Sequence, residues 1–252
     1  GQIDHMIGLL ASTLTRDGGT LQIGIGSLGD AIAYALRLRH QDNSAYRAAL
    51  AALGIEKQFG PAIEAMGGLD VFDQGLYGSS EMFINGFLEL YQSGVLKREV
   101  YPDETLQRLV NEGKIGPRIG PDILEVLLDA GVVQSRLTGA DVDWLRRFGI
   151  FKESVAYEDG TLRVDPEICM DADLNADGAV HDIVKHCLGP RLKQGIIMHG
   201  GFFLGPRNFY ETLKTMGPAE RKRFCMTSVM FVNQLYGNQT LAALQRTDAR
   251  FY

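Results

Sequence analysis

The segment TLQIGIGSLGDAIAYALRLR, Thr20–Arg39, decides the fold class, because it joins a strand, a glycine-rich turn and a helix in a short stretch of chain. Apolar residues alternate with polar residues and glycine over Leu21–Ile25, which is the period of a strand. Ser27 and Asp30 then predict a capping box at the start of a helix, and Arg39 falls at the end of that helix that favours cations.

Two more segments repeat this order of elements. Leu69–Gly78 has strand character and precedes a predicted helix over Phe83–Tyr91. Gly195–Met216 again reads as a strand, glycines, a proline and a helix, and Cys225–Leu235 predicts a further strand. Because strands and helices alternate, we expect an α/β fold with an open, mainly parallel sheet.

The middle of the chain differs from these units. Residues 102–165 contain several capped helical segments, with a capping box at Thr138 and Asp141. Asp159-Gly160 is typical of a hairpin turn. We therefore predict a helical subdomain over 102–165, inserted into a domain that covers 1–252.

Composition restricts the class of protein. The 252 residues carry a net charge of −6, which argues against non-specific binding to nucleic acid. The three cysteines are widely spaced and fit reduced thiols better than a disulfide framework. No apolar run is long enough for a membrane span, and no signal peptide opens the sequence. We expect a cytoplasmic protein that does not bind membranes.

The turn GIGSLG, Gly24–Gly29, matches the dinucleotide-binding pattern G-x-G-x-x-G. That reading also needs a second strand that ends in an acidic residue, whereas Asp42 lies in polar surroundings without strand character. An NAD-dependent dehydrogenase is therefore a minor alternative. The glycines instead let backbone N–H groups approach another ligand, or they simply form the turn.

Two segments have some features of metal sites. Asp173–Gly178 matches the front half of an EF-hand loop, but Val184 stands where the closing glutamate is required. His181 and His186 are five residues apart, unlike the pair that binds zinc from one helix face. The sequence therefore predicts no metal site.

Glu81, in YGSSEMF over 77–83, is the candidate nucleophile. We expect it between the end of a strand and the start of a helix, where the helix dipole favours an ionised carboxylate. Such a group can attack an activated carbonyl. His199 precedes Gly200 and Gly201 after an apolar segment, which predicts ligand contacts at the carboxyl end of a strand, with a packed histidine as the alternative.

Three segments together resemble the C-terminal domain of the acetyl-CoA hydrolase/transferase family of CoA-transferases. They are DGGTLQIGIGSLGDAI, LYGSSEMFINGFLELYQSGVL and HGGFFLGPRNFYETL. The resemblance implies an open α/β domain of the CoA-transferase type, and it is weakest over 102–165. It also implies that the glutamate of the S-E-M loop, here Glu81, is the nucleophile.

The implied reaction proceeds through a covalent glutamyl-CoA thioester on Glu81, with an acyl-CoA and a small carboxylate as substrates and no tightly bound cofactor. Transfer to a carboxylate and hydrolysis by water are both open. Expected contacts to the substrate come from Gln22 and Ser80 and from backbone groups of four glycines. These glycines are Gly24, Gly26, Gly200 and Gly201.

The chain departs from the family pattern at several points. Ser79 occupies the place of a histidine, and neither the later G-x-G-G segment nor the N-terminal domain of the family occurs. The sequence closes on the apolar ending of RTDARFY, 246–252. We therefore expect a piece of a longer protein that is inactive alone. A non-catalytic CoA- or partner-binding module is the alternative, and the family resemblance allows a homo-oligomer.

Overall fold

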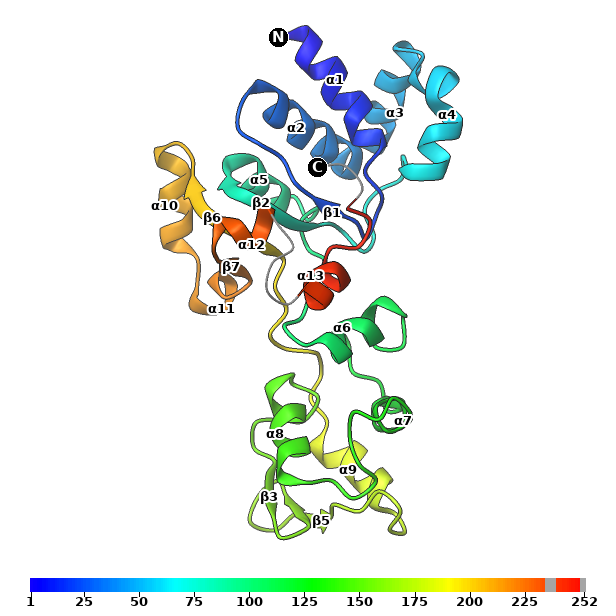
Figure 1. The fold of residues 1–252 in the computed structure, drawn as a ribbon, viewed down its shortest axis with the longest axis vertical. Helices are drawn as coiled ribbons and strands as arrows, with labels where there is room; N and C mark the ends of the chain where they lie inside the picture. The colour runs from blue at the N-terminus through cyan, green and yellow to red at the C-terminus, as the bar shows by residue number, and fades with distance from the viewer. Residues whose placement is uncertain (234–238, 250–252) are drawn as a thin grey trace. The chain divides into compact units, whose positions relative to one another are not determined.

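The computed structural model describes residues 1–233 and 239–249 (Figure 1). The chain forms two compact units. Unit 1 comprises Gly1–Val100 and the described part of Ile196–Tyr252, and unit 2 is Tyr101–Gly195. The predicted insertion, 102–165, lies within unit 2, which starts one residue earlier and continues to Gly195.

Unit 1 is built on a parallel sheet. Its strands are β1 (Thr20–Leu21), β2 (Tyr77–Ile84), β6 (Met198–Leu204) and β7 (Phe224–Met226). They lie in the order β1-β2-β6-β7, and every neighbouring pair is parallel. The carboxyl ends of these strands therefore share one edge of the sheet. Together with the helices, this confirms the expected α/β fold with a mainly parallel sheet.

Helices surround this sheet (Figure 1). Those of unit 1 are α1 (Gln2–Thr13), α2 (Ser27–Gln41), α3 (Asn43–Ala52), α4 (Ile55–Met66), α5 (Asn85–Gln92), α10 (Arg207–Thr215), α11 (Pro218–Arg221), α12 (Val229–Asn233) and α13 (Gln239–Gln245). Helix α5 packs against β2 and α2, whereas α12 packs against β2 and β6.

An aromatic cluster forms the centre of the core of unit 1. The ring of Phe83 in β2 stacks on Phe224 of β7, with centroids 5.0 Å apart. It also meets Phe203 of β6 and Phe209 of α10 edge to face, at 5.4 and 5.8 Å. Phe83 and Phe209 are fully buried. Because rings from two other strands and a helix meet on one residue of β2, this cluster fixes the position of α10 on the sheet.

Two predicted elements have different boundaries in the structure. Strand β2 continues through Phe83 to Ile84, so the predicted helix start at Phe83 is wrong and α5 begins at Asn85. Pairing of β2 with β6 up to Ile84↔Leu204 outweighs the helical spacing of the aromatic residues. The strand predicted over Cys225–Leu235 is also wrong, because β7 ends at Met226 and α12 follows. Residues 234, 235 and 250–252 lie outside the described residues.

The helix caps give a mixed result. Thr138 and Asp141 form the predicted capping box at the start of α8. The box predicted from Ser27 and Asp30 is wrong, because Gly26 is the N-cap of α2 and no side chain caps that helix. Gly26 has φ +112°, which a residue with a side chain rarely adopts.

Unit 2 has its own core and its own small sheet. Its helices are α6 (Glu104–Asn111), α7 (Ile123–Asp129), α8 (Gly139–Arg147) and α9 (Ala179–Cys187). Its antiparallel sheet is β3 (Ala156–Glu158), β4 (Thr161–Arg163) and β5 (Cys169–Asp171). The predicted hairpin turn is present, with positive φ at Asp159 and Gly160. Leu127, Leu145 and Phe151 are fully buried in the core of this unit.

The chain leaves unit 1 and returns to it at one point. Val100 and Ile196 form an antiparallel bridge, and each backbone N–H donates to the carbonyl oxygen of the other residue, at 2.8 and 2.9 Å. Both residues belong to unit 1. The ends of the segment that forms unit 2 are thus held together by unit 1 itself.

Candidate functional site

Glu81 lies on the second strand of the sheet, near its carboxyl edge. It is the fifth residue of β2 and is half-buried, and the pairs Ser80↔Gly200 and Met82↔Phe202 flank it. The position predicted for it, at the junction with a helix, is wrong, because three more strand residues precede α5. The dipole of α5 acts mainly at its first turn, so it gives Glu81 little support.

Ser80 connects β2 to the glycine-rich turn after β1. Its Oγ is buried and donates a hydrogen bond of 3.0 Å to the carbonyl oxygen of Ile23. Ile23 is the residue before Gly24, so this bond holds the start of the turn beside the residue that precedes Glu81. The structure thus brings together Ser80, Glu81 and the turn after β1, as expected for groups near the carboxyl ends of neighbouring parallel strands.

The three glycines of the GIGSLG turn have different structural roles. A Cβ at Gly29 would lie 2.1 Å from the carbonyl oxygen of Gly24, so close packing of the helix on the turn requires glycine there. Gly26 needs glycine for its positive φ. Gly24 is exposed, and a Cβ there would meet nothing within 4 Å. Packing therefore leaves Gly24 unexplained, and open space lies beside it.

Packing explains Gly201, the second glycine of β6. A Cβ at Gly201 would lie 2.6 Å from Val229 and 2.9 Å from the backbone oxygen of Glu81. At Gly200 it would lie 3.3 Å from the flexible end of the Met226 side chain, a contact that a small shift relieves. Gly200 pairs with both β2 and β7. The backbone of Gly200 is thus part of the sheet on both sides. Of the four glycines predicted to contact the substrate, only Gly24 and Gly26 are exposed to solvent.

His199 is buried within the sheet. It is the second residue of β6, so the expectation that it ends a strand is wrong. Its Nδ1 lies 2.6 Å from the hydroxyl of Tyr77, and the two rings meet edge to face. Burial, and secondarily the nearby Arg246, lowers the pKa of His199 to about 4. Its environment is that of the packed, neutral histidine given as the alternative above.

Buried cations surround the Tyr77–His199 pair. The guanidinium of Arg98 lies 5.2 Å from the centre of the Tyr77 ring, and its Nη2 donates to Thr20 Oγ1 at 3.1 Å. Burial lowers the pKa of Arg98 to about 10, and its Nε has no hydrogen-bond partner among the described residues. Arg246 is 6% exposed. This side of the sheet therefore carries positive charge close to β2.

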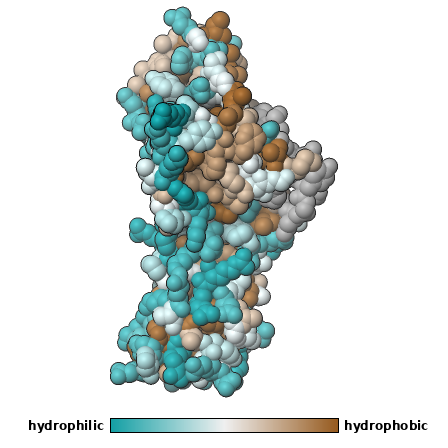
Figure 2. Space-filling view, turned by 90° about the vertical axis from the view of Figure 1, so that its left-hand side faces the viewer, coloured by the Kyte–Doolittle hydropathy of each residue, from teal (hydrophilic) through white to brown (hydrophobic). Residues whose placement is uncertain are grey.

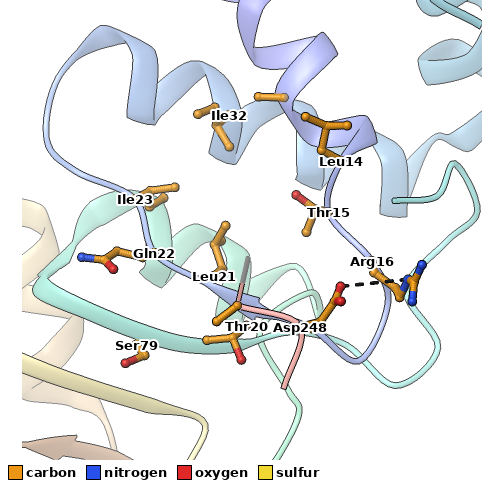
Figure 3. Close-up of a pocket in the computed structure, with 13 residues that line it drawn as sticks. Leu14, Thr15, Arg16, Thr20, Leu21, Gln22, Ile23, Ile32, Ser79 and Asp248 are labelled. Carbon is orange, nitrogen blue, oxygen red and sulfur yellow. Dashed lines mark ion pairs between the residues drawn. The ribbon is translucent and has the colours of Figure 1, made fainter. Parts of the chain in front are cut away.

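A cavity of about 230 Å³ lies beside β1 (Figure 3). Leu21 of β1 and Ile32 of α2 point toward each other from opposite walls of the cavity. Leu14, the residue that follows α1, also lines it. Gln22 and Ser79 lie at one side of the cavity, and Arg16 with Asp248 lies at the other. The candidate residue Gln22 thus lines a largely apolar cavity, whereas Glu81 is not among the lining residues.

Arg16 and Asp248 form an ion pair at the far side of this cavity, with 4.0 Å between Arg16 Nε and Asp248 Oδ2 (Figure 3). Thr20 Oγ1 and the backbone oxygen of Thr247 form a hydrogen bond of 2.9 Å in the same region. The segment after α13 is therefore attached to the β1 edge of the sheet. This attachment closes the cavity on the side away from Gln22.

Sequence reasoning missed Tyr77, Arg98 and Arg246 as parts of this region. Tyr77 lies in a predicted strand, but nothing in the sequence pairs it with a histidine far along the chain. Arg98 stands in a short charged stretch that resembles an exposed segment. The proximity of Tyr77 and His199 follows from the pairing of β2 with β6, which no local pattern encodes.

No metal or membrane feature adds to this site. Among residues 1–233 and 239–249, no group of three or more histidine, cysteine or acidic side chains is arranged to hold a metal ion. No helix in that part of the chain has the length and apolar character needed to cross a bilayer. The candidate site is therefore described by the side chains and backbone groups named above.

No protein-family model, curated protein or solved structure matches this chain. The likeness to the CoA-transferases thus depends on the three segments quoted from the sequence. Two of these segments contribute Ser80, Glu81 and the turn after β1 to one edge of the sheet. Function must be argued from that geometry.

Proposed function

We propose that the protein is a CoA-transferase or acyl-CoA hydrolase in which Glu81 is the covalent nucleophile. What supports this is the position of Glu81, half-buried near the carboxyl edge of a parallel sheet and next to Ser80, whose hydroxyl holds the glycine turn. Ligand sites in open α/β sheets lie at this edge. The substrates are an acyl-CoA thioester and a small carboxylate, and no tightly bound cofactor takes part.

In the first step, a carboxylate oxygen of Glu81 attacks the thioester carbonyl carbon. The C–S bond breaks, CoA leaves as its thiolate, and a mixed anhydride joins the acyl group to Glu81. The thiolate then attacks the glutamyl carbonyl carbon of this anhydride. The original acyl group leaves as a carboxylate, and Glu81 becomes a glutamyl-CoA thioester.

The second half of the reaction releases CoA from Glu81. In transfer, an acceptor carboxylate attacks the glutamyl thioester and expels the thiolate, which then attacks the acceptor side of the new anhydride. The products are the new acyl-CoA and the free carboxylate of Glu81. In hydrolysis, water attacks the thioester instead, and CoA leaves with a proton.

Each attack creates an oxyanion that backbone N–H groups can stabilise. The turn after β1 is the better source of such donors, because the backbone of Gly200 is paired with strands on both sides. Gly24 is exposed and has open space beside it. We assign oxyanion stabilisation to the turn that contains Gly24 and Gly26, with Gln22 beside the acyl group.

One observation favours the alternative, a non-catalytic CoA- or partner-binding module. The cavity next to β1 is lined by Gln22 and Ser79 but not by Glu81. Such a module would use this cavity for binding and would leave Glu81 unmodified. The two functions therefore differ in whether Glu81 becomes acylated.

The test is covalent trapping. The purified protein is incubated with acetyl-CoA and treated with borohydride, which reduces a glutamyl thioester to an alcohol, and its peptides are analysed by mass spectrometry. We expect reduction at Glu81 in the wild type and none in Glu81→Gln. Glu64→Gln, on the exposed surface of α4, is the matched control and retains the adduct. A folded wild type without an adduct contradicts the enzyme and supports the module.

A further inference from the structure

A second cavity, of about 440 Å³, lies in unit 1 between α10, α11 and the strands β6 and β7. Its walls are mostly apolar, and they are formed by Phe203, Leu213, Met216, Phe224 and Met226. This volume is within the range of small-molecule sites. Figure 2 shows the molecule from the side on which α10 lies in Figure 1. Apolar surface gathers there next to hydrophilic side chains.

Two cationic side chains also line this cavity, Lys214 at the end of α10 and Arg221 at the end of α11. Arg221 Nη2 donates a hydrogen bond of 2.8 Å to the backbone oxygen of Lys214, which fixes the guanidinium beside the lysine. Neither cation forms an ion pair with any residue that the structure describes. The cavity therefore combines apolar walls with two positive charges that remain available to an anion.

The walls also restrict the rest of the ligand. The only hydroxyl that lines the cavity among the described residues is that of Tyr210, and it already donates to the backbone oxygen of Phe203 at 3.2 Å. A nucleobase would leave its polar edge without partners in such surroundings, which is costly. A hydrocarbon chain has no such groups. Apolar walls with cations beside them thus fit a hydrocarbon that ends in one anionic group.

We propose that this cavity binds a medium-chain monocarboxylate, with its alkyl chain against Leu213 and Phe224 and its carboxylate beside Lys214 and Arg221. This site does not rest on the function proposed for Glu81. Binding here is non-covalent, so it is measured without turnover. A failure of either proposal leaves the other intact.

The experiment is calorimetric titration of the 252-residue chain with octanoate and, separately, with neutral 1-octanol. We expect saturable binding of both, with octanoate tighter by about fivefold for each cation that contributes. In a Lys214→Gln/Arg221→Gln double variant, octanoate weakens to the affinity of octanol. Lys222→Gln, an exposed lysine next to Arg221 that does not line the cavity, is the control and binds octanoate like the wild type.

Leu213→Trp fills the cavity and should weaken both ligands, with circular dichroism to verify the fold. The double variant alters exposed side chains only, so it tests the proposal even if Leu213→Trp does not fold. Absence of saturable octanoate binding overturns the proposal. The same holds if Lys222→Gln weakens octanoate as much as the double variant, or if a folded Leu213→Trp binds both ligands unchanged.

Discussion

The hydroxyl of Tyr77 lies 2.6 Å from Nδ1 of His199, and this contact joins β2 to β6 inside the sheet. Both side chains are buried. We expect Tyr77→Phe to leave a buried imidazole nitrogen without this partner and to lower the free energy of unfolding by about 1–3 kcal/mol. Urea denaturation measures the change. Tyr34→Phe, at an exposed tyrosine, should be close to neutral, and equal losses in the two variants would contradict the assignment.

His199 should make stability depend on pH. Burial lowers its pKa in the folded state from 6.5 to about 4, so between these values the unfolded chain binds more protons. The stabilisation is complete above about pH 6.5 and is lost as pH falls toward 4, and it amounts to about 3 kcal/mol. Unfolding free energies across this range check it. His199→Gln should reduce the slope, although His40, whose pKa burial also lowers, retains part of it.

The glycine turn allows steric and functional roles to be separated. Gly29→Ala places a Cβ against the carbonyl oxygen of Gly24, and we expect it to destabilise the fold by about 1–3 kcal/mol. Gly24→Ala meets open space and should change stability by less than about 0.5 kcal/mol. Thermal denaturation of the two variants compares them. If Gly24→Ala keeps its stability but slows formation of the Glu81 adduct, the turn acts on the reaction and not only on the fold.

The cysteines should differ in reactivity. Cys187 is fully buried, and burial raises its pKa to about 11, whereas Cys169 is exposed. At about pH 8, Cys187 then has roughly a hundredfold less thiolate than an ordinary cysteine. A disulfide reagent should therefore label Cys169 quickly and Cys187 only after unfolding. A Cys169→Ser/Cys225→Ser variant isolates Cys187, and rapid labelling of that folded variant would be inconsistent with its burial.

Arg39 should be a stabilising residue of the first two helices. It is 1% exposed, its guanidinium donates to the backbone oxygens of Ser12, Thr15 and Asp70, and it lies 4.3 Å from the centre of the Phe72 ring. Arg39→Met should lower the unfolding free energy by about 2–5 kcal/mol, because three carbonyl groups lose a charged donor. Arg37→Met, in a half-exposed ion pair with Glu89, should cost about 1 kcal/mol or less. Chemical denaturation compares the two.

The sequence predicted the fold class because its signals are local. The alternation over Leu21–Ile25 and the glycines after it indicate a strand, a turn and a helix, although β1 is shorter than that pattern. The predicted helix start at Phe83 is wrong, because β2 continues to Ile84 through pairing with β6, and that pairing depends on residues far along the chain. Likewise, Arg39 resembled a cation at a helix end, whereas the fold buries it beneath Phe72.

The candidate site shows the same division. The sequence alone indicated Ser80 and the glycine turn as candidate parts of the site, because the carboxyl ends of parallel strands meet at one edge of the sheet. The contact of Tyr77 with His199 was not predictable from the sequence. It requires the register Ser79↔His199 between β2 and β6, and the whole of unit 2 separates these two strands in the sequence. The role of Gly201 also needed coordinates, because packing against Val229 and the backbone of Glu81 explains it.

The bridge between Val100 and Ile196 brings the two ends of the intervening segment to adjacent positions in unit 1. A short linker could therefore span the gap, and the parallel sheet would keep its strand order without Tyr101–Gly195. In evolutionary terms, such a segment is a separable insertion in unit 1. It can be acquired, exchanged or lost in a single event while the strands of the parallel sheet around Glu81 stay in register.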